Sequence, residues 1–115
     1  TLALASSSPM VLIQATLTAF NLENTFKAVV SAEDLPYGKP HPEVYLNAAK
    51  AINVHPFDCI ALEDSFTGLL AAKSAQMKTI VVPEAIHFAE PRFAIADLKL
   101  ESLEKLTPEH LTQLV

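Results

Sequence analysis

Two adjacent carboxylates, Glu63 and Asp64, follow an apolar run at residues 60–62 and precede Ser65, a good helix-capping residue. A short continuous apolar run is typical of a buried parallel strand, and ligands of open α/β sheets bind at the carboxyl ends of the strands. Neighbouring carboxylates raise each other's pKa unless a cation compensates, and Mg²⁺ prefers oxygen ligands that include one or two carboxylates. The pattern therefore predicts a Mg²⁺ site at a strand end. The alternative is a solvated pair of acids beside a helix start.

Two further features could complete such a site. Residues 6–8 are three serines directly before Pro9, and hydroxyl and backbone N–H groups at a helix start can hold phosphate oxygens. Lys39 lies in a proline-punctuated loop, where its ammonium would supply a point charge for an anion. Each feature also fits a plainer role, since serines often cap helices and loop lysines are often solvated. Together with Glu63 and Asp64, they predict a phosphate-and-metal site.

The hydrophobic pattern predicts the elements that would carry these residues. The predicted strands cover residues 2–5, 26–31, 59–62, 79–82 and 96–100, and the predicted helices cover residues 9–20, 43–52, 65–77 and 108–114. We expect the first helix to follow a Ser cap and to bury Met10, Ile13, Leu17 and Phe20. Strands that alternate with helices indicate an α/β fold, a three-layer Rossmann-like parallel sheet with helices on both faces.

Composition narrows the functional classes. The chain has 115 residues, half of them hydrophobic, which is enough for one small domain with a single core. A net charge of −5 and scattered basic residues argue against a nucleic-acid partner, and no apolar stretch reaches the length of a membrane span. Cys59 is the one cysteine, and its apolar surroundings indicate a small core residue. The cytoplasm fits this cysteine usage best.

Three segments carry a resemblance to a known family, and together they extend over nearly the whole chain. They are Leu4-Ala5-Ser6-Ser7-Ser8-Pro9, Gly38-Lys39-Pro40-His41-Pro42 and Ala61-Leu62-Glu63-Asp64-Ser65. These segments are similar to the second, third and fourth motifs of the phosphoglucomutase-like phosphatases in the haloacid dehalogenase superfamily. Residues 31–37 and 80–83 look most like the 2-deoxyglucose-6-phosphate phosphatases, also called hexitol phosphatases.

The resemblance implies a role for each candidate residue. Ser6 and the backbone N–H of Ser7 would bind the transferring phosphoryl group, and Lys39 would neutralise the charge of its oxygens and of the nucleophile. Asp64 would ligate Mg²⁺ directly, and Glu63 would act beside it through a metal-bound water. The substrate would be a small phosphorylated sugar or sugar alcohol, hydrolysed through an aspartyl-phosphate.

The superfamily's first motif, an Asp-x-Asp that supplies the nucleophile and the general acid, has no counterpart in this sequence. Residues 1–115 are therefore interpreted as the C-terminal part of such a core domain, which lacks the first strand and the helical cap. We expect it to be inactive alone, because no protein group would attack phosphorus. A non-catalytic module that binds phosphate or oligomerises, and a sugar-phosphate mutase of the same family, are the alternatives. Loss of a central strand would expose two sheet edges, through which the chain could dimerise.

The remaining conspicuous side chains receive structural interpretations. Tyr37 and Tyr45 are interpreted as packing residues, because no basic track accompanies them as in a surface that stacks nucleic-acid bases. His41 lies between two prolines and is expected to be exposed. Gln76 stands where many members of the resembled family have a helix-ending Gly, and a left-handed backbone at a non-glycine residue costs about 1 kcal/mol.

Overall fold

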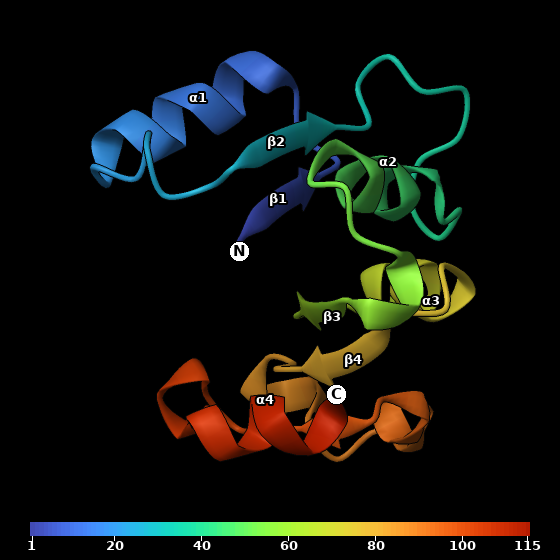
Figure 1. Cartoon of the computed structure of the whole chain (residues 1–115). Helices are drawn as coiled ribbons and strands as arrows, with labels where there is room; N and C mark the ends of the chain where they lie inside the picture. The colour runs from blue at the N-terminus through green and yellow to red at the C-terminus, as the bar shows by residue number, and fades with distance from the viewer.

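The computed structural model describes residues 1–115 and shows an alternation of parallel strands and helices (Figure 1). The strands are β1 (Ala3–Ser6), β2 (Ala28–Ser31), β3 (Ile60–Glu63), β4 (Lys78–Val81) and β5 (Leu98–Lys99). The α-helices are α1 (Met10–Ala19), α2 (Glu43–Ala51), α3 (Phe66–Ser74) and α4 (Pro108–Leu114). The predicted order and type of these elements are confirmed, with ends displaced by a few residues. No helix has both the length and the apolar character needed to cross a membrane.

The strands form two parallel sheets, with the break at the place where the sequence analysis expected a central strand to be missing. β1 pairs in parallel with β2, while β3, β4 and β5 form a second parallel sheet in that order. Figure 1 shows the two sheets as distinct groups, with β1 and β3 as the edges on the sides that face each other. The prediction that β1 and β3 would each have an unpaired edge is therefore confirmed. The sheet is divided in two because no strand of this chain lies between β1 and β3.

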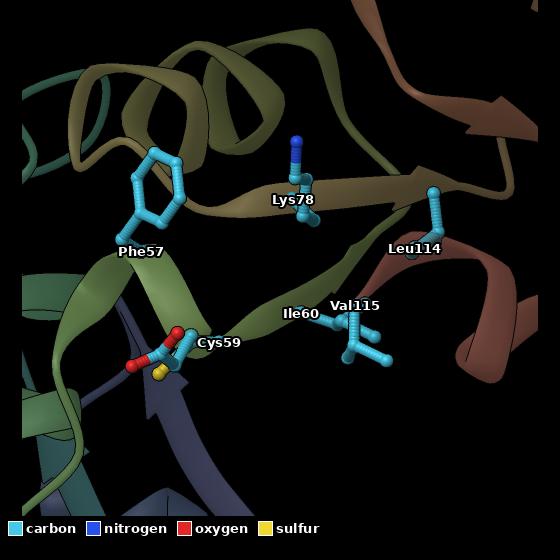
Figure 2. Close-up of a pocket in the computed structure, with 7 residues that line it drawn as sticks. Phe57, Cys59, Ile60, Lys78, Leu114 and Val115 are labelled. Carbon is cyan, nitrogen blue, oxygen red and sulfur yellow. The ribbon is translucent and has the colours of Figure 1, made fainter.

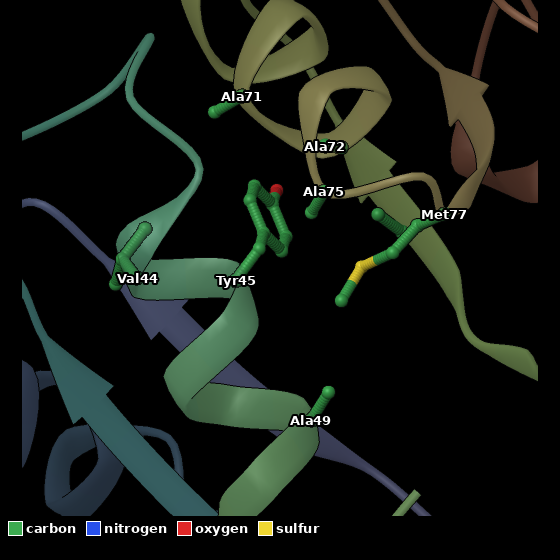
Figure 3. Close-up of a cluster of buried hydrophobic side chains, with 8 residues drawn as sticks. Val44, Tyr45, Ala49, Ala71, Ala72, Ala75 and Met77 are labelled. Atoms are coloured by element: carbon green, nitrogen blue, oxygen red, sulfur yellow. The ribbon is translucent and has the colours of Figure 1, made fainter. Parts of the chain in front are cut away.

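The two sheets share one hydrophobic core, centred where α2 meets α3. The core residues come from both helices and from β3, and β1 and β2 pack against them through Ala5 and Val30. Figure 3 shows the large side chains of Tyr45 and Met77 among small ones. The core residues are Val44, Tyr45, Ala49, Ala61, Ala71, Ala72, Ala75 and Met77. The alanines allow the helices to approach closely, so this joint positions one sheet relative to the other.

Helices α1, α2 and α3 all end in the same way, with a residue in the left-handed conformation. These residues are Asn21, Asn53 and Gln76, with φ values of 56°, 57° and 66°. At the end of α3, Gln76 donates its N–H to the Lys73 carbonyl and Met77 donates its N–H to the Ala72 carbonyl, which is a Schellman motif. The left-handed conformation expected at Gln76 is therefore confirmed.

The start of α1 differs from the sequence prediction. Its N-cap residue is Pro9, and no side chain caps the helix by hydrogen bonding from that position. Ser8 lies one residue before this N-cap, and its own N–H donates back to Ser6 Oγ at 3.1 Å. A remote carboxylate substitutes, since Met10 donates its N–H to Glu33 Oε2 at 3.0 Å.

The predicted buried stripe of α1 is also only partly correct. Ile13 and Leu17 are buried and Met10 is half-buried, but Phe20 is 69% exposed. Phe20 follows the last residue of the helix, where the chain turns into the left-handed Asn21. Its ring consequently leaves the stripe that the helical spacing predicted.

Candidate active site

Lys39 connects the carboxyl ends of β1 and β3, the two strands that do not pair. Its Nζ lies 2.5 Å from Glu63 Oε1, at the end of β3, and 3.5 Å from the Ala5 carbonyl oxygen, near the end of β1. The backbone of Ser6 hydrogen-bonds toward β2. Because successive residues of a strand bond to opposite sides, the Ala5 carbonyl faces away from β2, toward the space between β1 and β3. The sequence-predicted Lys39, Ser6 and Glu63 are thus brought to one edge of the fold.

Glu63 is held on several sides. Its side chain is 7% exposed and that of Lys39 is 14% exposed, so both charges are largely withdrawn from water. Glu63 Oε1 accepts from Lys39 and also from the hydroxyl of Tyr45. The carboxylate lies directly over Gly68 in α3, where a Cβ would overlap it. A buried carboxylate requires this degree of compensation, because desolvation of an unpaired charge is costly.

Tyr45 is the site residue that sequence reasoning missed. The interpretation as a packing residue is correct for its ring, which belongs to the core, but the hydroxyl also donates to Glu63. Burial, followed by the charge of Glu63, raises the pKa of Tyr45 well above its ordinary value, so the hydroxyl stays protonated as a donor. The Lys39 ammonium also lies over the Tyr45 ring, 4.9 Å from its centroid. A tyrosine at a core position of α2 was the available signal, because a buried hydroxyl requires a partner.

The serines after β1 present donors near the end of the strand. Ser6 is half-buried, and its Oγ accepts from the Ser8 N–H, which leaves the hydroxyl proton free to donate. Ser7 is exposed, and its backbone N–H has no acceptor within the chain. The N–H groups of Ser8 and Met10 are already occupied, so they are not free for an anion. The donors available here are the hydroxyl of Ser6 and the N–H of Ser7, the groups that the sequence singled out.

Asp64 is the exposed member of the acidic pair. It follows β3 immediately, and Ser65 behind it caps α3 by accepting the Gly68 N–H at 3.0 Å, as the sequence predicted. No group of three or more His, Cys, Asp or Glu side chains lies close enough to hold a metal ion. The chain therefore supplies two carboxylates, of which Asp64 is open to solvent. That set fits Mg²⁺, which commonly takes one or two carboxylates and completes its shell with water and phosphate oxygens.

A separate hollow of about 240 Å³ lies at the opposite ends of the strands (Figure 2). Its walls include Ile60 and Lys78, the first residues of β3 and β4, together with Leu114 and Val115 at the end of the chain. None of the predicted site residues lines it. The chemistry-bearing groups are at the carboxyl ends, as expected for a parallel α/β sheet.

Comparison with known proteins identifies the family. Residues 1–82 match the model of the haloacid dehalogenase-like hydrolases. The chain belongs to this family. The predicted α/β class is confirmed by its solved structures, with only a partial core present in this short chain.

Individual members of the haloacid dehalogenase-like hydrolases resemble most of the chain. It is 50% identical over 108 residues to hexitol phosphatase B of Escherichia coli K12, a match that covers 94% of this chain and 49% of the relative. A haloacid dehalogenase hydrolase of Entamoeba histolytica superimposes with a TM-score of 0.86 at 27% identity, covering 97% of this chain and 52% of that structure. A β-phosphoglucomutase of Clostridium difficile gives a TM-score of 0.83 at 29% identity, covering 96% and 47%. The chain thus spans about half the length of these relatives.

Proposed function

We propose that this chain is part of a Mg²⁺-dependent phosphatase that hydrolyses small phosphorylated sugars or sugar alcohols through an aspartyl-phosphate. The observation that carries the proposal is the position of Lys39, an ammonium held between the ends of β1 and β3 beside the donors of Ser6 and Ser7. Family membership and the 50% identity to hexitol phosphatase B support the reaction and the substrate class. The cytoplasm is the proposed location.

Each site residue then has a defined task. Ser6 donates its hydroxyl proton, and Ser7 its backbone N–H, to oxygens of the phosphoryl group. Lys39 neutralises the phosphoryl charge from a largely buried position, where a fixed cation is most effective. The chain has no Asp-x-Asp pair, so the attacking carboxylate and the general acid are not among its residues. We therefore expect no turnover by the 115-residue chain alone.

Asp64 and Glu63 are the residues proposed to hold Mg²⁺. Asp64 is open to solvent and would ligate directly, while Glu63 is engaged by Lys39 and Tyr45 and would contribute through a bound water. When bound, the ion would offset the negative charge of the phosphoryl oxygens.

The deciding experiment compares the native protein from its source with the 115-residue chain. We expect the native protein to exceed 12.5 kDa and to release inorganic phosphate from hexitol and hexose phosphates with Mg²⁺. The chain alone should bind inorganic phosphate without turnover, and Lys39→Met should abolish that binding while Lys50→Met, on an exposed lysine, should not. Efficient turnover by the pure chain, or unchanged phosphate binding by Lys39→Met, would contradict the proposal.

Two alternatives give different results in the same experiment. A mutase, suggested by the similarity to β-phosphoglucomutase, would yield an isomeric sugar phosphate in place of free phosphate. A non-catalytic module, suggested by the unpaired edges of β1 and β3, would have a native mass of 12.5 kDa per chain and would form a dimer.

A further inference from the structure

Tyr45 reaches the site from inside the core, a placement unlike that of the other candidate residues. Its side chain projects from α2 toward α3, among Ala71, Ala72 and Ala75 (Figure 3). The residue is 7% exposed, and its ring cannot rotate away without disturbing these alanines. Its hydroxyl is therefore a fixed donor at the carboxyl end of β3.

The hydroxyl of Tyr45 restrains Glu63 together with two other groups. Glu63 Oε1 accepts from Tyr45 and from Lys39, so a rotation of the carboxylate would break both bonds. The other side of the carboxylate rests on Gly68, the one residue type with room for it there. Glu63 consequently has one well-defined orientation.

This orientation determines where the Lys39 ammonium lies. A lysine has a flexible four-carbon stem, and a free ammonium would extend into water. Here the ammonium is surrounded by Glu63 Oε1 at 2.5 Å, the Ala5 carbonyl at 3.5 Å and the Tyr45 ring at 4.9 Å. A charge that is already in place stabilises a reacting anion without reorganising at the moment of reaction.

We propose that Tyr45 is a positioning residue for Lys39: its hydroxyl orients Glu63, which fixes the Lys39 ammonium at the end of β1. Gly68 makes this arrangement possible by leaving space for the carboxylate. The importance of Lys39 for phosphate rests on the proposed function, whereas the positioning itself can be measured without any phosphate.

The test is Tyr45→Phe in the full chain, which removes the hydroxyl and keeps the ring. Tyr37→Phe is the matched control, because Tyr37 is 63% exposed and stacks on His41 away from Glu63. Nitrogen-detected NMR of the lysine ammonium groups follows Lys39 directly. We expect a slowly exchanging Lys39 signal in the wild type and in Tyr37→Phe, and its loss in Tyr45→Phe.

Inorganic phosphate is the probe for the second measurement. We expect its affinity to fall roughly tenfold in Tyr45→Phe, because a Lys39 ammonium that is no longer held in place must be ordered when phosphate binds. An unchanged Lys39 signal in Tyr45→Phe overturns the proposal whatever happens to phosphate. If the wild-type chain binds no phosphate but the Lys39 signal is still lost in Tyr45→Phe, the positioning role is supported and the result counts only against the proposed function.

Gly68→Ala provides an independent check from the other side of Glu63. The new Cβ must displace the carboxylate, and alanine is a better helix former than glycine, so α3 should remain folded. We expect the Lys39 signal to be lost in this variant as well, with circular dichroism unchanged. A retained Lys39 signal in folded Gly68→Ala would overturn the positioning role of Glu63.

Discussion

The ammonium of Lys39 and the carboxylate of Glu63 are both largely withdrawn from solvent, so each provides the main compensation for the other's charge. Their ion pair joins the loop that carries Lys39 to the end of β3, across 24 positions of the sequence. Removing one partner leaves the other charge poorly compensated in a region with little water. The pair therefore affects stability as well as phosphate binding.

Lys39→Met should lower the free energy of unfolding by about 3 kcal/mol, because the largely buried Glu63 carboxylate loses the cation that compensates it. Adding Glu63→Gln should recover part of that loss, since the neutral amide needs no counter-charge, while phosphate binding stays abolished. Urea unfolding of the single and double variants measures both effects. Equal stability of Lys39→Met and the wild type would show that this ion pair has no net role in folding.

The residue scale also shows what the sequence could and could not predict about the site. Ser6, Lys39 and Glu63 were identified because each lies in a loop or at a strand end, where local pattern is informative. The hydroxyl bond of Tyr45 was missed because it depends on how α2 packs against β3 and α3, which no local pattern encodes. The Ser cap of α1 was predicted wrongly because the helix begins at Met10, which makes Pro9 the N-cap, and Glu33, distant in sequence, takes the Met10 N–H.

At the scale of elements, the ends of the helices and the edge of the second sheet are fixed by specific polar contacts. Asp97, just before β5, accepts from the backbone N–H of Thr79 at 2.8 Å, from its hydroxyl at 3.1 Å and from Lys73 at 3.3 Å. Partial burial opposes ionisation of Asp97, but the bonds from Thr79 and Lys73 outweigh it, so its pKa lies below its ordinary value. This carboxylate attaches β5 to β4 and α3.

Asp97→Ala should reduce the free energy of unfolding by about 1–3 kcal/mol at pH 7, the effect of losing a charged acceptor. Because the folded pKa is lowered, the contribution of Asp97 is complete above its unfolded value of about 3.9 and is lost as pH falls through the folded value. When unfolding is measured from pH 7 downward, the free energies of unfolding of the wild type and of Asp97→Ala should converge in acid. Asp34→Ala, in an exposed loop, should run parallel to the wild type, and parallel curves for Asp97→Ala would refute the linkage.

Gln76→Gly should stabilise the chain by about 1 kcal/mol, because Gln76 adopts φ 66° and glycine bears no Cβ penalty there. Asn53→Gly is the comparison, with a smaller gain expected, since Asn tolerates the left-handed region better than Gln. Thermal and urea unfolding measure the difference. A loss of stability in Gln76→Gly would mean that contacts of the Gln76 side chain, or the greater conformational entropy that glycine gives the unfolded chain, outweigh the relief of backbone strain.

At the scale of the whole molecule, one core cluster holds two sheets that share no strand pairing. Alternation of hydrophobic patterns was sufficient to predict the elements and the parallel α/β class. The alternation alone could not predict the division into two sheets, because the local pattern of β1 and β3 is that of central strands. The missing Asp-x-Asp motif, read through the family resemblance, was the signal for two unpaired edges. The α2–α3 joint provides the connection instead.

Ala72→Leu, at the centre of that joint, should cost about 1–3 kcal/mol of unfolding free energy, because the added methylenes have no space. Ala51→Leu makes the same change on an exposed position at the end of α2 and should have almost no effect. Urea unfolding of both variants tests the comparison. A fully tolerated Ala72→Leu would show that the joint is loosely packed.

The two open edges also determine how fast individual backbone amides exchange with deuterated water. In a parallel strand, the backbone groups of successive residues point alternately to one side of the strand and to the other. The Ser6 carbonyl accepts from β2's side and the Glu63 carbonyl from β4's side, so the even residues of β1 bond toward β2 and the odd residues of β3 bond toward β4. The amides of Ala3, Ala5, Ile60 and Leu62 consequently face the gap. Exchange along each strand should alternate between fast and slow from one residue to the next, and a strand from any second molecule entering the gap would slow the fast set alone.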